Sequence, residues 1–318
     1  MEMNETKNVL TRKEKHKWMR KLFILSFMIV PVVHFLIFYV YVNLDSFVMA
    51  FQAPKDGEYV FVGFKNFEKV WKLIKEGSTY PQENLQLAFV NTFKTFGIQL
   101  VMFPIGLFVS YFIYKKITGY RTFRIIFYLP SIISAVVVSF FFTELMRYDS
   151  FFVEMIKKLS GVDYQLSPLT DSSFANSMVF LNMIWLGFPG NIIVWGGTFS
   201  RIPDSVIESA RLDGASWVRE MFQIVLPLVW PTFVLMITTQ IAMVFGATGN
   251  VFLLTKGEAN TQTVSNWIYM KVLSTPNPLT SDGLNTVSAL GLALTVISCA
   301  IALFVRKVLN SRVEEIQY

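Results

Sequence analysis

The most constraining feature of this chain is a set of six apolar runs, each long enough to cross a lipid bilayer as a helix. They cover residues 22–42, 88–114, 125–145, 175–199, 228–246 and 284–305. A transmembrane helix needs about 20 predominantly apolar residues. Charged residues make up only 16% of the 318-residue chain, against about 25% in a typical soluble domain. The sequence therefore predicts an all-α integral membrane protein with six transmembrane helices.

The loops between these runs differ in charge, and this difference predicts on which side of the membrane they lie. Lys and Arg concentrate in cytoplasmic loops. The N-terminus, loops 115–124 and 200–227, and the C-terminus together hold 17 Lys and Arg against 9 Asp and Glu, whereas the rest of the chain holds 11 against 13. Both termini are therefore predicted to be cytoplasmic. The net charge of +6 reflects this topology, and we expect no nucleic-acid partner.

The same topology divides the chain into a basic cytoplasmic N-terminus (1–21), a transmembrane domain (22–305) and a cytoplasmic tail (306–318). The first apolar run is too long for the apolar core of a cleaved signal peptide, so we expect it to remain as a membrane span. The loop 43–87 is predicted to be extracytoplasmic. Its aromatic residues and mixed charges predict a small subdomain or an interfacial helix near residues 65–75.

The residues that carry most enzyme chemistry are scarce. The chain has two histidines, His16 and His34, and one cysteine, Cys299, so neither a metal site nor a catalytic triad can be assembled from them. The phosphate-binding pattern G-x-x-x-x-G-K-[ST] is absent. We therefore expect no enzyme activity, no metal and no cofactor in this chain.

A charged stretch between the fourth and fifth runs, IESARLDGASWVREMFQIVLP (207–227), has the pattern of two short helices. Pro203 and Asp204 suit the start of a helix, and Gly214 suits its end. Apolar residues at spacings of one, three and four predict a second helix with one apolar face, and Pro227 then marks re-entry into the membrane. An ordinary amphipathic connection at the membrane surface accounts for the periodicity equally well.

The residues of this stretch resemble a known signature. Glu208-Ser209-Ala210, three residues, Gly214, nine residues and Ile224-Val225-Leu226-Pro227 are similar to the pattern E-A-A, x3, G, x9, I-x-L-P of bacterial binding-protein-dependent ABC importer permeases. Every spacing is kept, and only Ser209 departs. Asp213-Gly214-Ala215 also resembles the core of the carbohydrate branch.

Other segments extend the resemblance along most of the chain. VGFKNF (62–67), Asn91-Thr92, RIIFYLP (124–130) and WLGFP (185–189) are similar to elements of sugar permeases. TKGEA (255–259) departs from the T-x-G-G-P that the family often carries.

This resemblance implies a type I ABC importer permease in the bacterial plasma membrane, with the stretch 202–226 as its cytoplasmic coupling helix. The implied partners are a second permease subunit, two ABC ATPase subunits that bind ATP and magnesium, an extracytoplasmic solute-binding protein and a sugar or oligosaccharide. The implied ATPase-coupling residues are Glu208, Ser209, Ala210, Asp213, Gly214, Ala215, Ile224, Leu226 and Pro227.

Alignment with maltose-type permeases also implies residues of a substrate path. They are Leu186, Gly187, Gly190, Gln240, Met243 and Val244. Close helix packing is the alternative explanation for the two glycines.

The fourth, fifth and sixth runs contain no Asp, Glu, Lys, Arg or His, which argues against strongly ionic cargo. It also argues against the rival function, a stand-alone ion-coupled transporter. His34, well inside the first run, is either a neutral side chain facing other helices or the proton relay of such a transporter.

Overall fold

The computed structural model describes residues 2–161, 166–246, 250–275 and 283–311. Its helices are α1 (Glu2–Phe35), α2 (Val42–Ala50), α3 (Lys65–Glu76), α4 (Leu85–Tyr114), α5 (Tyr120–Ile132), α6 (Ala135–Leu145), α7 (Phe151–Ser160), α8 (Ala175–Phe199), α9 (Asp204–Leu212), α10 (Trp217–Glu220), α11 (Leu226–Ala242), α12 (Val251–Leu254), α13 (Val264–Ser274) and α14 (Gly283–Asn310). Two π-helical segments, η1 (Leu36–Tyr41) and η2 (Met221–Val225), and two strands, β1 (Gln52–Lys55) and β2 (Glu58–Phe61), complete the described elements.

Five helices in the described residues are long and apolar enough to cross a bilayer, and they become six if the bent pair α5 and α6 forms one span. The fourth predicted run coincides with α8, and the second and sixth lie within α4 and α14. The prediction of an all-α chain with six spans is therefore confirmed as a mostly helical fold with the broken pair α5 and α6 as one of its six spans. The predicted tail 306–318 begins inside α14, and residues 312–318 lie outside the described residues.

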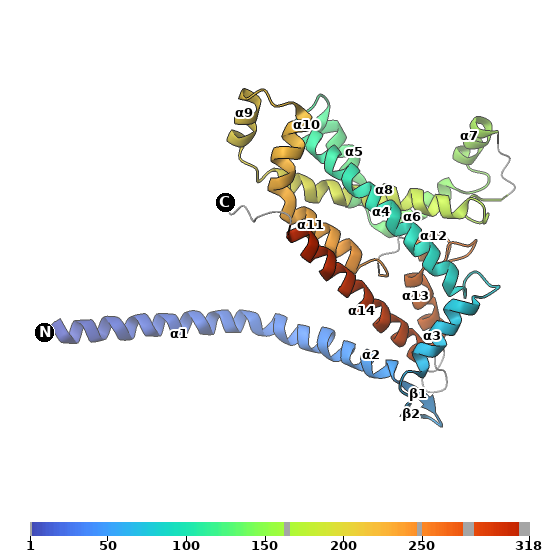
Figure 1. The fold of residues 1–318 in the computed structure, drawn as a ribbon, viewed down its shortest axis with the longest axis horizontal. Coiled ribbons are helices and arrows are strands. Elements are labelled where there is room, and N and C mark those ends of the chain that lie inside the picture. Colours follow the sequence, from blue (N-terminus) through green and yellow to red (C-terminus); the bar gives the residue numbers. More distant parts are fainter. Residues whose placement is uncertain (1, 162–165, 247–249, 276–282, 312–318) are drawn as a thin grey trace.

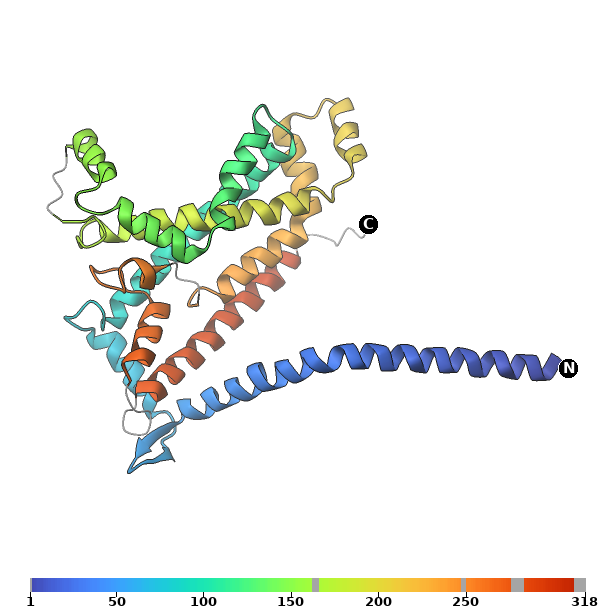
Figure 2. The same cartoon turned by 180° about the vertical axis from the view of Figure 1, so that it is seen from behind.

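The first span stands apart from the rest of the molecule. A continuous helical stretch, Lys17–Ala50, extends beyond the predicted run at both ends. In its most apolar 18 residues, no residue is buried against the rest of the described chain. Figures 1 and 2 show α1 projecting from the body, with α2 joining it at the end that carries β1 and β2. The helix shows no break at the predicted boundary between residues 21 and 22.

The third predicted span, 125–145, is not one helix. It consists of α5 and α6, which meet at an angle of 101°. Pro130 has no N–H to continue the helical ladder, and the Ser131 hydroxyl donates to the carbonyl of Tyr128 (2.7 Å). The backbone is then extended at Ile133 (φ −82°, ψ 142°). The break lets α6 lie against α8 and α12.

The fifth predicted span and the predicted second surface helix form one helix instead of two. The segments α10, η2 and α11 run on from Trp217 to Ala242, so Pro227 does not end the helix. A proline ring inside a helix clashes with the carbonyl four residues earlier. The wider π-helical turn Met221–Val225 directly before Pro227 accommodates the ring without ending the helix.

The loop after the first span contains the predicted helix, α3, and a hairpin that was not predicted. Strands β1 and β2 pair antiparallel, with Gln52 opposite Phe61. The buried side chain of Asn66 in α3 donates to the carbonyls of Ala50 (2.9 Å) and Gln52 (2.8 Å). These bonds attach the hairpin to α3. The chain is thus not purely α-helical.

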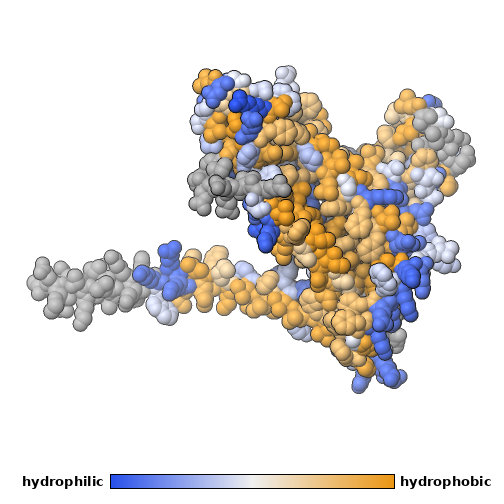
Figure 3. Space-filling view, viewed as in Figure 1, coloured by the Kyte–Doolittle hydropathy of each residue, from blue (hydrophilic) through white to orange (hydrophobic). Residues whose placement is uncertain are grey.

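Three apolar clusters hold the body together. One joins α3, α13 and the first turns of α4 and α14, at what we call the hairpin end. A second joins the last turns of α4 and α8 to α9, η2 and α11, at what we call the α9 end. The third packs α6 against α8 and α12. In Figure 3, apolar side chains cover the middle of the molecule, and hydrophilic side chains gather over α9 and along the edge near α3.

Candidate functional site

A glycine corner ends α9, as the sequence predicts. Pro203 precedes the helix in an extended conformation, and Asp204 lies in its first turn. At the other end, the N–H of Ala215 donates to the carbonyl of Ala210 and that of Gly214 to Arg211, both at 3.0 Å. Gly214 has φ +72°, a value that suits glycine. This pair of bonds is a Schellman motif, which satisfies the last carbonyls of α9 and turns the chain sharply.

The structure divides the nine predicted coupling residues between two places. Glu208, Ser209, Ala210, Asp213, Gly214 and Ala215 lie on α9 and its corner, where all are exposed except buried Ala210 and half-buried Ala215. Ile224, Leu226 and Pro227 are half-buried in η2 and α11. Within the described part of the chain, Glu208 forms no hydrogen bond or ion pair, which leaves its carboxylate free for a partner.

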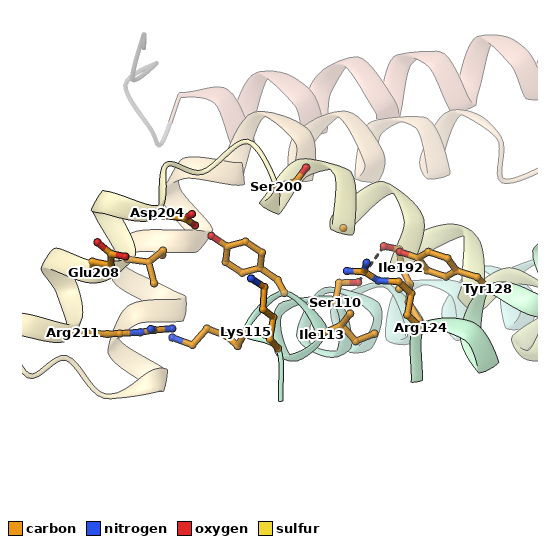
Figure 4. A pocket seen from close by; sticks show the side chains of 14 residues that line it. Ser110, Ile113, Lys115, Arg124, Tyr128, Ile192, Ser200, Asp204, Glu208 and Arg211 are labelled. Carbon is orange, nitrogen blue, oxygen red and sulfur yellow. Dashed lines mark hydrogen bonds between the residues drawn. The ribbon is translucent and has the colours of Figure 1, made fainter. Parts of the chain in front are cut away.

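A cavity of about 530 Å³ separates α9 from the ends of the spans. Figure 4 shows Asp204, Glu208 and Arg211 on its α9 wall, Lys115 at the end of α4, and Arg124 and Tyr128 on α5. One side of α9 therefore faces this hollow space, while Ile207 on the helix packs into the cluster at the α9 end.

The connection after the corner is held by a buried charge that sequence reasoning missed. Glu220, at the end of α10, has a side chain only 2% exposed. Its Oε1 accepts hydrogen bonds from Tyr111 Oη (2.9 Å) and Lys115 Nζ (2.7 Å), and its Oε2 accepts from Lys115 Nζ (2.6 Å). Both partners belong to the last turn of α4 or directly follow it. We call these three residues the Glu220 cluster.

Aromatic and apolar contacts surround the Glu220 cluster. Trp217 packs on Phe112 with ring centroids 5.5 Å apart, and Phe222 meets Phe108 at 5.9 Å. Met221 is fully buried in the cluster at the α9 end. Trp217, Met221 and Phe222 belong to the apolar face predicted for the second helix of this stretch, and their contacts place that face against α4 and the cluster at the α9 end.

Three of the predicted substrate-path residues line one cavity of about 600 Å³. Leu186, Gly187 and Gly190 contribute from α8, beside Gln99 of α4 and the break between α5 and α6. A Cβ atom built on Gly187 or Gly190 would meet nothing within 4 Å. Within this chain the two glycines therefore face open space and do not mediate close helix packing.

A second, smaller cavity of about 170 Å³ adjoins the first and shares Gln99 and Gly187 with it. Gln240 lines this one, whereas Met243 and Val244, at and beyond the end of α11, line neither. The buried Oε1 of Gln240 has no hydrogen-bond partner in the described part of the chain.

The walls of the larger cavity are neutral and polar in part. Gln99, Ser131, Asn250 and Ser265 provide amides and hydroxyls, and neither cavity has a charged residue in its lining. These four residues were missed, although Gln99 was visible as an amide within an apolar run. Among the described residues no group of three or more His, Cys, Asp or Glu is placed to hold a metal ion. The polar groups in this lining can donate and accept hydrogen bonds, and none of them carries a charge.

Residues 255–259, which differ from the T-x-G-G-P pattern, form a tight loop at the end of α12 that hydrogen bonds hold in place. Lys256, Gly257, Ala259 and Asn260 all have positive φ angles. The buried Asn91 Nδ2 donates to the carbonyls of Asn260 (2.7 Å) and Gln262 (2.8 Å), which ties the loop to α4. The loop is therefore fixed by α4 and is not a free surface segment.

Known proteins with similar sequences include permeases named for sugars. The maltose/maltodextrin transport system permease protein MalF of Vibrio cholerae is 29% identical over 212 residues, which are 64% of this chain and 38% of that protein. The galactooligosaccharides transport system permease protein GanP of Bacillus subtilis is 27% identical over 294 residues, 89% of this chain and 66% of that protein. The chain thus spans well under half the length of MalF and about two thirds of GanP.

The fold agrees with a solved structure. A chain from a bacterial ABC transporter involved in the import of the acidic polysaccharide alginate superposes with a TM-score of 0.75 and 21% identity, covering 95% of this chain and 100% of that one. A family model described as "binding-protein-dependent transport system inner membrane component" matches residues 102–315, which include α8, the α9 corner and both cavities' α8 walls. The chain belongs to this family of membrane transport permeases.

Proposed function

We propose that this chain is a transmembrane subunit of an ATP-driven importer that takes up a neutral oligosaccharide delivered by an extracytoplasmic binding protein. The observation that carries the proposal is the charge-free, glycine-lined cavity beside the break between α5 and α6. Family membership supports the dependence on a binding protein.

The cavity chemistry favours a neutral sugar over an acidic one. Amide and hydroxyl groups exchange hydrogen bonds with sugar hydroxyls, whereas a uronate would bring a carboxylate into a site with no positive charge in its lining. Gln240 Oε1 is an acceptor without a partner, which a sugar hydroxyl would satisfy. MalF and GanP are named for neutral oligosaccharides, and the alginate transporter is named for an acidic polysaccharide.

The α9 corner supports coupling to an ATPase. Its exposed face carries an unpaired carboxylate, Glu208, and its rigid Schellman turn connects directly to α10 and α11. Partner ATPase subunits would bind ATP and magnesium. Their closure would move α9, and the helix Trp217–Ala242 would carry that movement toward Gln240 and the cavity, as alternating access requires.

The first experiment is purification of the tagged protein from its native membranes in mild detergent, with bound proteins identified by mass spectrometry. We expect ATPase subunits with their own phosphate-binding loops, a second permease and, on addition, a solute-binding protein. Recovery of the chain alone, stable and monodisperse, would refute the importer assignment.

The substrate class is tested at Gly190. Substitution Gly190→Tyr fills the open space that the glycine leaves in the cavity, so uptake of long neutral oligosaccharides should fall. Gly97→Tyr is the matched control, because Gly97 also lies in a span with nothing within 4 Å but lines neither cavity. Unchanged uptake in the Gly190 variant, or uptake of uronate oligomers by the wild type, would contradict the proposal.

A further inference from the structure

The Glu220 cluster joins the chain segment after the glycine corner to a different transmembrane helix. Glu220 belongs to α10, whereas Tyr111 lies in the last turn of α4 and Lys115 follows it, more than 100 residues earlier in the chain. Three hydrogen bonds to one carboxylate cross this junction. The Tyr111 side chain is fully buried, and Lys115 is 17% exposed.

Holding two helices together by a buried ion pair has a large desolvation cost. Taking a carboxylate and an ammonium group out of water costs about as much as their attraction returns, and well-packed apolar side chains of similar size often stabilise a protein equally well. The surroundings of Glu220 are apolar and aromatic, so a methionine or leucine would fit the composition of this cluster. The charged groups provide directional hydrogen bonds, and these bonds fix the position of α10 along and around α4.

The two helices that leave this junction both reach the cavities. The helix that contains Glu220 continues through α11 to Gln240, about 30 Å away at 1.5 Å per residue. Helix α4 runs from Tyr111 back to Gln99, about 18 Å away, which lines both cavities. A movement of α9 therefore has a covalent route to Gln240, whereas its route to Gln99 passes through contacts between helices.

The contacts available for that second route differ in kind. The rings of Phe103 on α4 and Phe233 on α11 pack at 5.1 Å, and Trp217 packs on Phe112 at 5.5 Å. Ring contacts of this type favour certain tilts but include no hydrogen bond, so they fix one helix along another less firmly. The bonds of Glu220 to Lys115 and Tyr111 are directional, and they lie in the first helical turn after the α9 corner.

From this geometry we infer that Glu220, Lys115 and Tyr111 form a latch that makes α4 move together with the α9–α10 corner. Glu220 is a positioning residue: it transmits the movement of α9 to the Gln99 wall of the cavity and touches neither ATP nor sugar. This inference rests on the proposed function and adds the element through which coupling reaches α4. Without the latch, α11 follows α9 while α4 lags, and ATP is hydrolysed without completing transport.

The test measures the number of ATP molecules hydrolysed per sugar taken up. The complete transporter, with its ATPases, partner permease and binding protein, is reconstituted in proteoliposomes. The variant Lys115→Met with Glu220→Met replaces the latch by an apolar pair that keeps the packing. We expect the ratio to rise by about two- to thirtyfold, the range that single contacts contribute to coupling between sites. Arg219→Gln is the control, because Arg219 is an exposed neighbour whose side chain bonds to Gln223 and, among the described residues, to no member of the latch.

A second readout follows the junction directly. With Cys299 replaced by serine, spin labels at the exposed positions Val218 and Lys116 report the distance between α10 and the end of α4. In the wild type we expect this distance to stay constant when ATP and binding protein are added, and in the double methionine variant we expect it to change.

Two results would overturn the latch. One is an ATP-to-sugar ratio in the double variant equal to that of the Arg219 control, which would make the cluster purely structural. The other is a label distance that changes with ATP in the wild type. If the double variant does not assemble, Glu220→Gln, which keeps the size and removes the charge, is measured by the same ratio. Absence of any binding-protein-stimulated ATP hydrolysis in the wild type would instead refute the proposed function.

Discussion

Asn91 is the clearest point at which to test how the loop after α12 is held. Its side chain is 1% exposed, and Nδ2 donates to the carbonyls of Asn260 and Gln262. Substitution Asn91→Leu keeps the size of the side chain and removes both bonds. The Asn260 carbonyl keeps a second donor, Asn176 Nδ2 at 3.0 Å, so loss of its bond from Asn91 costs about 0.5–1.5 kcal/mol.

The Gln262 carbonyl belongs to a fully buried residue, and losing its donor there costs about 1–3 kcal/mol. A third effect opposes the loss of these two hydrogen bonds. Asn91 Oδ1 is buried without a partner among the described residues, so removing it stabilises the protein by about 1 kcal/mol. The two losses exceed the gain, and the net destabilisation is roughly 0.5–3.5 kcal/mol. At about 2 °C per kcal/mol for a chain of this size, the melting temperature should fall by about 1–7 °C.

The assay is thermal unfolding of the purified protein in one detergent, followed by circular dichroism. Asn176→Leu is the matched control, because it removes one bond from a half-buried residue and leaves both carbonyls with Asn91. It should lower the melting temperature by about half as much or less. A variant at Asn91 that melts within about 1 °C of the wild type, or no lower than the Asn176 variant, would refute this account of the loop.

Three further changes test other parts of the structure. Gly257→Ala should destabilise the protein by about 2–4 kcal/mol, because the backbone is strained at φ +87° and the new Cβ atom would lie 2.5 Å from Gln262 Oε1. The control Gly57→Ala, at φ +85° with nothing within 4 Å, should cost only about 1–2 kcal/mol. Equal melting temperatures of the two variants would contradict this. Glu208→Ala should abolish transport while changing the free energy of unfolding by less than about 0.5 kcal/mol, and lost membrane insertion would show instead that α9 is needed for folding. Gln240→Leu should lower sugar uptake by about tenfold without loss of stability, since Oε1 has no partner to lose, and unchanged uptake would place the sugar elsewhere.

The parts of the fold that were predicted correctly depend on local rules. Hydropathy alone placed α8, because a bilayer requires about 20 apolar residues regardless of tertiary contacts. The corner after α9 was predicted from Gly214, because a left-handed residue favours glycine wherever it occurs. The helix α3 followed from its charged and apolar pattern in the same way.

The parts that were predicted wrongly involve proline in helices. The surface helix before Pro227 and the span after it were predicted as separate elements, yet one helix runs through Pro227, whereas the span containing Pro130 was predicted as one helix and is broken. The same residue type had opposite outcomes because each depends on which neighbours satisfy the freed backbone groups. At Pro130 the nearby Ser131 competes for a carbonyl, and α6 gains contacts with α8 by bending. Ser131 stands next to Pro130 in the sequence, but the contacts between α6 and α8 are not visible there.

The predicted substrate-path residues also differ in where the structure places them. Leu186, Gly187 and Gly190 meet in one cavity because they share a helix face, so a match to one short motif was enough to group them. Met243 and Val244 were inferred by alignment back from residues 253–255, and they lie at and beyond the end of α11, outside both cavities, so their role stays a prediction.

The Glu220 cluster shows which signal the sequence did contain. Lys115 was counted only as a topological charge, and its partner lies 105 residues further along the chain. Glu220, however, sits three residues after Trp217 and directly before Met221, within the apolar face of the predicted helix. A carboxylate on such a face must be paired, because an unpaired buried charge costs more than a single helix can offset. The pattern therefore required a basic partner on another helix. Among the basic residues at the end of α4, the fold selects Lys115, at the point where α9 meets the spans.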